Sequence, residues 1–182
     1  DELKIFVRII EGNLIIALTP VIAIGMLFAP VVVMVFAPGF SADGVRFTLA
    51  SDMVRVTFPY LGFISLTALA GAVLNSHHRY AIPAFTPVLL NLSLIGAVLF
   101  AADLFATPVY ALAWGVLVAG ALQLAFQAPA LQRLGLLVAP RVSVTHPGAK
   151  QVGRLLLPAV FAASVSQINA LIDTILASTL IT

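Results

Sequence analysis

The last apolar segment of the chain carries polar side chains whose types and spacing suit chemistry. Ser166, Asn169 and Asp173 follow one another at i, i+3 and i+7, so a helix would place them along one side. This polar stripe on an otherwise apolar helix suits either an ion site or the wall of an aqueous cavity. Ser166, Gln167 and Asn169 are therefore candidates for the lining of a cavity.

Asp173 is the ionisable member of this group. A carboxylate at the centre of a membrane helix costs about 2.5–3.5 kcal/mol on insertion scales, and such groups usually face a cavity, a partner or an ion. Asp173 is therefore a candidate cation or proton site. The alternative is that Asp173 lies near the outer end of a tilted helix and reaches the lipid headgroups.

Neutral polar residues lie inside two other apolar segments. Gln123 and Gln127 are spaced i, i+4, and Asn91 and Ser93 lie early in their segment. Amides and hydroxyls commonly form hydrogen bonds between membrane helices, with gains of about 0.6–2 kcal/mol. We predict that these side chains join helices, and the alternative is that they contact a substrate.

His77, His78 and Arg79 form a compact basic cluster between two apolar segments. Adjacent helical residues do not face one another, and no third ligand lies at a recognisable spacing, so contact with headgroups is a better interpretation than a metal site. The sequence contains no cysteine, no H-E-x-x-H, no G-x-S-x-G, no P-loop and no second intramembrane aspartate. We therefore expect neither an enzyme nor a cysteine-ligated metal site.

The composition indicates the elements that must position these residues. The chain is 62% hydrophobic and 9% charged, whereas soluble domains carry roughly 25% charged residues. About 20 apolar residues cross the hydrocarbon core as a helix. Five runs are long enough, at residues 14–36, 56–74, 84–102, 109–131 and 155–180. We predict an all-α, multi-pass integral membrane protein with five transmembrane helices, belonging to a larger bundle because both ends of the chain look internal.

The basic residues divide unevenly between the two sides that alternating spans would create. One side would hold Lys4, Arg8, Arg79, Arg133, Arg141, Lys150 and Arg154, and the other would hold Arg46 and Arg55. By the positive-inside rule the first side is cytoplasmic, which includes the amino terminus. These residues are spread over three loops instead of one nucleic-acid-like patch, so anionic membrane lipids are the expected partner and nucleic acid is not.

Proline and glycine mark the connections between the spans. We expect residues 36–55 to form an outer loop, and the Thr107-Pro108 turn to join antiparallel neighbours. Residues 132–153 form the longest predicted connection, and their last part is either a short interfacial helix or plain loop. Pro83 and Pro87 would start or kink the third helix, and Pro158 would do so in the fifth.

Several segments together resemble one protein family, the MurJ/MviN family of bacterial lipid II flippases. They are F-A-P-G-F from Phe36, T-F-P-Y from Thr57, A-G-A-V-L-N-S from Ala70, R-Y-A-I-P-A-F-T-P-V-L-L-N-L-S from Arg79, A-L-A-W-G-V from Ala111 and L-P-A-V-F-A-A-S-V-S-Q-I-N from Leu157. The positions that carry the likeness include Asn75, Arg79, Pro83, Pro87, Asn91 and Pro158. The resemblance covers essentially the whole chain, in the family's order.

The resemblance implies a bacterial inner-membrane transporter of the multidrug/oligosaccharidyl-lipid/polysaccharide superfamily, with fourteen helices in two lobes. Residues 1–131 would supply four helices of the first lobe, residues 132–153 would cross between lobes on the cytoplasmic side, and residues 154–182 would begin the second lobe. Such proteins move lipid II, the undecaprenyl-pyrophosphate-linked peptidoglycan precursor, to the periplasmic leaflet by alternating access. This transport supplies cell-wall synthesis and so maintains cell shape.

The resemblance also bears on ions and on the pyrophosphate. Some family members hold sodium with an acid on the seventh helix, and Asp173 matches the position of that acid, whereas other members carry an amide there. Sodium is the only cofactor expected. The arginines that would pair with the pyrophosphate lie chiefly on helices outside this chain.

Two other hypotheses stand beside the flippase. One is a related exporter of drugs or of another polysaccharide-lipid. The first two helices of the complete protein would distinguish the two, because a flippase should carry several arginines there and such an exporter should not. The other is a membrane scaffold that transports nothing, for which changes at Asp173 would have no consequence.

Overall fold

The computed structural model describes residues 2–42, 44–143 and 145–180, without the side chains of residues 41, 42, 165, 166, 169 and 180. This part of the chain is all-α. The α-helices are α1 (Glu2–Leu27), α2 (Ala29–Phe36), α3 (Gly44–Thr57), α4 (Tyr60–Ser76), α5 (Ala81–Gly96), α6 (Val109–Arg133) and α7 (Pro147–Leu180). Short 3-10 or π segments are η1 (Pro38–Ala42), η2 (Ala97–Ala101) and η3 (Ala102–Leu104).

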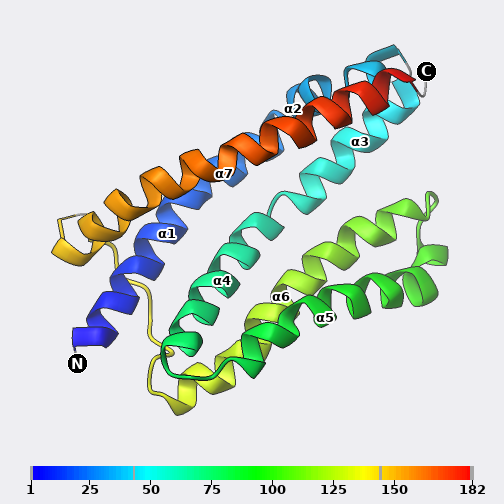
Figure 1. Ribbon diagram of the computed structural model, residues 1–182. Coiled ribbons are helices and arrows are strands. Elements are labelled where there is room, and N and C mark those ends of the chain that lie inside the picture. The colour runs from blue at the N-terminus through cyan, green and yellow to red at the C-terminus, as the bar shows by residue number, and fades with distance from the viewer. Residues whose placement is uncertain (1, 43, 144, 181–182) are drawn as a thin grey trace.

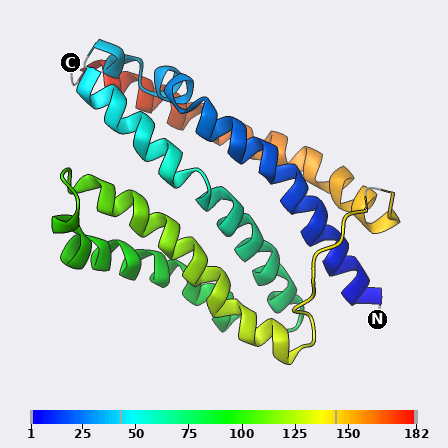
Figure 2. The same cartoon turned by 180° about the vertical axis from the view of Figure 1, so that it is seen from behind.

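The helices run back and forth between two ends of an elongated bundle (Figures 1 and 2). One end of the bundle, which we call the near end, holds the start of α1, the turn between α4 and α5, and the connection between α6 and α7. The far end holds η1, the turn between η3 and α6, and the end of α7. α4 packs against α6, α5 and α6 form an antiparallel pair as predicted, and α7 lies along α1 and α2.

Four helical stretches among the described residues are long and apolar enough to cross a membrane: Glu2–Leu27, Gly44–Ser76, Ala81–Leu104 and Val109–Arg133. The fifth predicted crossing falls on α7, where some side chains are not described, and in which Ala170–Thr179 is a shorter apolar stretch. The class of an all-α membrane protein is confirmed, and the number of five crossings stays a prediction.

The predicted outer loop at residues 36–55 is wrong, because most of it is the helix α3. Together α3 and α4 make a stretch of 33 residues, which is about 50 Å long, whereas the hydrocarbon core is about 30 Å thick. The charged residues of α3 can therefore lie beyond the hydrocarbon while the backbone stays helical. Pro59, which has no N–H for a helical hydrogen bond, separates α3 from α4.

Two other predicted boundaries are wrong for the same reason. α1 begins at Glu2 instead of residue 14. α7 begins at Pro147 instead of residue 155, and proline is favoured at the first position of a helix. The connection between α6 and α7 is therefore residues 134–146 instead of 132–153, and its last predicted part is neither a separate helix nor a loop but the start of α7. The charged residues at these helix ends suggest loop by their polarity, whereas Glu, Lys and Arg favour helix.

Two helices end at the near end in the same hydrogen-bonded motif. After α6, Leu136 N–H donates to Leu131 O and Gly135 N–H donates to Gln132 O, both at 2.9 Å, with Gly135 at φ 67°. This is the Schellman arrangement, and it brings Leu136 back against Leu131 in a buried cluster with Leu74. After α4, His78 takes the same left-handed position at φ 59°, which is uncommon for a residue other than glycine.

Gly120 provides a direct test of the packing between α4 and α6. A Cβ atom at this position would lie 2.8 Å from Phe63 Cβ and from Tyr60 Cδ2, so the two helices would have to separate. We expect Gly120→Ala in the complete protein to lower the free energy of unfolding by about 1–3 kcal/mol, as overpacking does. Thermal unfolding in detergent measures this change.

Gly96→Ala is the matched control, because nothing lies within 4 Å of a Cβ atom there. It should leave stability unchanged or raise it by up to about 1 kcal/mol, since alanine favours helix. Equal stability of the two variants would contradict the close approach of α4 and α6.

Candidate functional site

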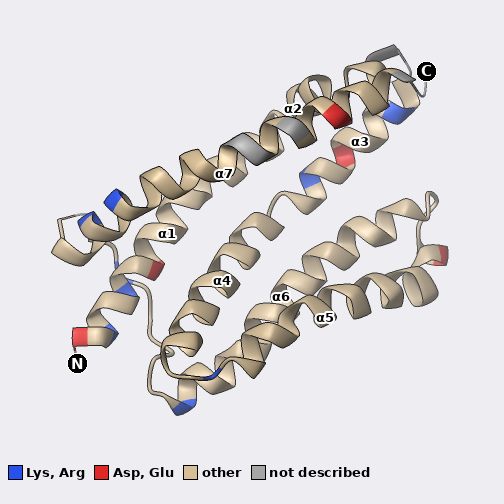
Figure 3. Ribbon diagram, viewed as in Figure 1, with Lys and Arg blue, Asp and Glu red and all other residues tan. Residues whose placement is uncertain are grey.

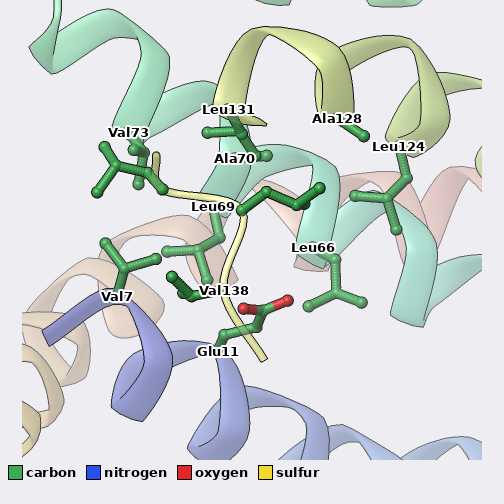
Figure 4. A pocket seen from close by; sticks show the side chains of 12 residues that line it. Val7, Glu11, Leu66, Leu69, Ala70, Val73, Leu124, Ala128, Leu131 and Val138 are labelled. Atoms are coloured by element: carbon green, nitrogen blue, oxygen red, sulfur yellow. The ribbon is translucent and has the colours of Figure 1, made fainter. Parts of the chain in front are cut away.

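A cavity of about 120 Å³ lies at the near end, between α1, α4, α6 and the connection. Its described walls are apolar apart from Glu11 of α1. Among them are Leu66 and Val73 of α4, Leu124 of α6, and Leu136 and Val138 of the connection. Figure 4 shows the Glu11 side chain pointing into this cavity from below.

Glu11 was missed by the sequence analysis, which placed the start of the first span after it. The signal was the spacing of Val7 and Glu11 at i, i+4, which puts them on the same face of a helix. A carboxylate facing apolar walls must be protonated, hydrated or paired with a cation, because an isolated charge there is costly. The charged form of Glu11 would therefore need water or a cation beside it in the cavity.

Two buried glutamines on α6 hold the helices around this region together. Gln123 is 2% exposed, and its Nε2 donates to Thr86 O of α5 at 2.9 Å, while Tyr60 Oη of α4 donates to its Oε1 at 3.4 Å. Gln127 is 1% exposed, and its Nε2 donates to Thr67 O of α4 at 3.1 Å. The prediction that these two side chains join helices is confirmed.

The other predicted pair on the third apolar segment behaves differently. Asn91 is exposed on α5, so it joins no helices among the described residues. Ser93 is partly buried, and its hydroxyl has no hydrogen-bond partner within the described chain. The prediction that Asn91 and Ser93 join helices is therefore wrong for this part of the protein.

The family-like prolines shape α5 and α7. Pro83 is the third residue of α5 and packs on Gly71, and Pro87 lies inside the same helix. Because Pro87 has no N–H, the carbonyl of Pro83 loses its helical partner, and the Thr86 hydroxyl donates to that carbonyl at 2.8 Å instead. Pro158 lies inside α7, which continues through it.

The basic turn between α4 and α5 lies at the surface of the near end. Asn75 and Arg79 are exposed, and their backbone groups cap α4. His77 Nδ1 lies 2.9 Å from Val73 O, and His78 Nδ1 lies 3.0 Å from Tyr80 Oη. Among the residues described, no three His, Cys, Asp or Glu side chains are grouped as metal ligands.

The residues predicted on the last apolar segment all fall on α7. Gln167 and Asp173 are exposed on this helix, and neither is among the residues that line the near-end cavity. The side chains of Ser166 and Asn169 lie outside the described residues. The cation site at Asp173 and the cavity lining therefore stay predictions.

Charge is distributed unevenly over the bundle (Figure 3). Basic residues gather at the near end, in the first turns of α1 and α7, the last turn of α6, the α4–α5 turn and the connection. α3, in the far half, carries Arg46 and Arg55, and Arg55 forms an ion pair with Asp52 at 2.8 Å. Tyr110 Oη of α6 donates to the same carboxylate at 3.0 Å, which ties α3 to α6.

Comparison with known proteins gives one consistent result. The family described as Lipid II flippase MurJ matches residues 1–182. The chain is 42% identical to the lipid II flippase MurJ of Burkholderia cenocepacia, over 99% of the chain and 36% of that protein. It is 38% identical to the probable lipid II flippase MurJ of Haemophilus influenzae, over 100% of the chain and 37% of that protein. The chain thus spans little more than a third of the relatives it matches.

Substituting Gln123 tests how strongly the buried amides join the helices. Gln123→Leu keeps the size of the side chain but removes the hydrogen bond to Thr86 O. We expect the free energy of unfolding of the complete protein to fall by about 0.6–2 kcal/mol, the range for such bonds in membranes. Thermal unfolding in detergent measures it. Gln132→Leu, at an exposed position of the same helix, is the control, and a loss as large as that of Gln123→Leu would refute the joining role.

Proposed function

Because this chain belongs to the lipid II flippase MurJ family, we propose that it forms part of a transporter that moves lipid II from the cytoplasmic to the periplasmic leaflet of the bacterial inner membrane. The observation that carries the proposal is the match of the family over all 182 residues. The activity belongs to the complete protein, since the chain spans only about a third of its relatives.

The proposed orientation places the near end in the cytoplasm. It is supported by the seven lysines and arginines at that end, because cytoplasmic loops carry an excess of these residues. In this orientation the basic near end meets the anionic cytoplasmic headgroups, which attract such residues by about 1 kcal/mol each. The near-end cavity with Glu11 then opens toward the cytoplasmic side.

The proposed division into lobes assigns α1 to α6 to the first lobe and α7 to the start of the second. It is supported by the exposure of α7, whose apolar side chains Leu157 and Phe161 are each 77% exposed. Side chains of this kind need lipid or further helices around them. Alternating access would then be a movement of the second lobe against the first, as in many transporters. The transport itself requires no covalent chemistry, so we propose a carrier and not an enzyme.

We propose that Asp173 supplies one ligand to a sodium ion. A carboxylate oxygen is the type of ligand that a hard cation prefers, and an ion site usually needs several such oxygens. The Asp173 side chain is exposed, so helices outside this chain can contribute the remaining ligands. This arrangement would couple sodium to the position of α7 relative to the rest of the protein.

The transport proposal is tested with the complete parent gene in bacteria depleted of their own lipid II flippase. We expect restored growth and lipid II that becomes accessible to a reagent at the periplasmic face. Membrane insertion is checked in the same cells. A well-inserted protein that exposes no lipid II would instead favour a related exporter or a scaffold.

The sodium proposal is tested by Asp173→Asn in the complete protein, because the amide keeps the size but removes the negative charge. We expect sodium affinity, measured by isothermal titration calorimetry on purified protein, to fall at least tenfold. Asp103→Asn, at an exposed position in η3 of the far end, is the control and should bind sodium as the parent does. Unchanged sodium binding in Asp173→Asn would show that the ion lies elsewhere.

A further inference from the structure

The connection between α6 and α7 forms one wall of the near-end cavity, and hydrogen bonds fix this wall to α1. Asn13 of α1 forms a double hydrogen bond with Ser143, in which Asn13 Nδ2 donates to Ser143 O at 2.9 Å and Ser143 N–H donates to Asn13 Oδ1 at 3.0 Å. One turn earlier, Arg141 N–H donates to Arg8 O at 2.8 Å, and Arg8 Nε donates to Ala139 O at 3.0 Å. The chain itself therefore holds this wall, as expected of a binding site that is largely pre-formed.

Two glycines let the wall lie this close to the helices. A Cβ atom on Gly12 of α1 would lie 2.5 Å from the carbonyl carbon and oxygen of Arg141, which are backbone atoms and cannot rotate away. Gly135, at φ 67°, lets the chain turn back after α6, so that Leu136 packs against Leu131. Both leucines line the cavity. The apolar wall is therefore built into the backbone.

Glu11 points into this cavity without a cationic partner among the described residues (Figure 4). Its carboxylate forms no ion pair and no hydrogen bond with them. Arg8 lies three residues before Glu11, a spacing at which the two could pair, but the Arg8 Nε is bonded to Ala139 O instead. Lys4, the other basic residue of α1, has its Nζ only 3.6 Å from the place of a Cβ atom on Gly135. The charge of Glu11 is thus left to a group that enters the cavity.

Water and bare metal ions suit this cavity poorly. Buried water typically forms about three hydrogen bonds, and the described side chains that line the cavity offer only the Glu11 carboxylate. An apolar group gains affinity by displacing water that is held so weakly. A hard cation such as sodium needs several oxygen ligands, which these walls do not supply. The complementary guest therefore has one positive end and an apolar body.

We propose that the near-end cavity binds a small organic cation, a primary ammonium on an apolar body no larger than one ring. The ammonium donates charge-assisted hydrogen bonds to the Glu11 carboxylate, and the apolar body lies against Leu66 and Leu124. The volume of about 120 Å³ sets the size, because an apolar cavity of about 150 Å³ holds one benzene molecule. This site goes beyond the proposed function and does not include Asp173.

The binding is tested on the complete protein in detergent with benzylamine, which is a cation at neutral pH. Benzyl alcohol is the matched neutral probe of nearly the same shape, and methylamine is a cation without the apolar body. Saturation-transfer NMR titrations give each Kd. We expect a Kd on the order of 1 mM for benzylammonium and binding at least tenfold weaker for the other two. Benzyl alcohol that binds as tightly as benzylammonium, or no binding of benzylammonium, would overturn the proposal.

Glu11→Gln identifies the group that receives the ammonium, because the amide keeps the size but removes the charge. It should weaken benzylammonium binding at least tenfold and leave the binding of benzyl alcohol unchanged. Glu2→Gln is the matched control, since Glu2 lies on the same helix but lines a different hollow, and it should bind as the parent does. Benzylammonium binding that survives Glu11→Gln would refute the site.

Ala128→Leu tests the apolar walls. Ala128 of α6 lines the cavity, and a leucine there would fill much of it, so binding of benzylammonium should fall at least tenfold. Ala125→Leu, at an exposed position of the same helix, is the control and should leave the Kd unchanged. Thermal unfolding checks that each variant is folded, and Glu11→Gln, which adds no bulk, decides the question by itself if Ala128→Leu does not fold. Full binding by a folded Ala128→Leu protein would place the guest outside the cavity.

These measurements need no lipid II, so the two proposals fail separately. If benzylammonium binds through Glu11 but the complete protein exposes no lipid II, the flippase proposal fails and the cation site stands. If lipid II is exposed but the binding of benzylammonium does not depend on Glu11, the inference about the cavity fails alone.

Discussion

The lack of water in the hydrocarbon interior is the constraint on which the rest of this structure depends. A backbone N–H or C=O without a partner costs several kcal/mol there, so a segment that faces lipid must satisfy these groups within itself. Helices do so along nearly all of the described chain. Where Pro87 interrupts the pattern, the Thr86 hydroxyl replaces the missing donor to the Pro83 carbonyl. Among the described residues, the long stretch without helix that follows α6 lies at the near end, and its residues 139–143 are hydrogen-bonded to α1.

The same solvent changes what holds the helices to one another. Lipid tails are as apolar as leucine side chains, so helices associate through close packing and hydrogen bonds more than through the hydrophobic effect. Gly115 and Gly120 bring α6 close to α5 and α4, where the Gln123 and Gln127 amides reach backbone carbonyls. α4, α5 and α6 thus form one tightly joined unit.

The sequence was sufficient to predict the class of fold, the antiparallel pairing of α5 with α6 and the role of the two glutamines, because apolar length and buried amides are local signals. It did not predict α3, because charged residues are common in loops but also occur where a helix extends beyond the hydrocarbon. Glu11 was missed because its role depends on the walls that α4, α6 and the connection place around it. The Asn13 bond to Ser143 joins residues 130 positions apart, which no spacing rule connects.

The way α7 packs on the rest of the chain reflects the same dependence on close packing and hydrogen bonds. Its described side chains include a single buried one and no buried amide of the kind that unites α4 to α6, although Gly148 lies close to the Phe6 ring of α1. The remaining two thirds of the protein, or lipid, must cover its apolar sides. Packed units move as rigid bodies and change at the contacts between them. Among the described residues, α7 meets the rest of the chain along α1 and α2 and at η1, where Ser178 is buried.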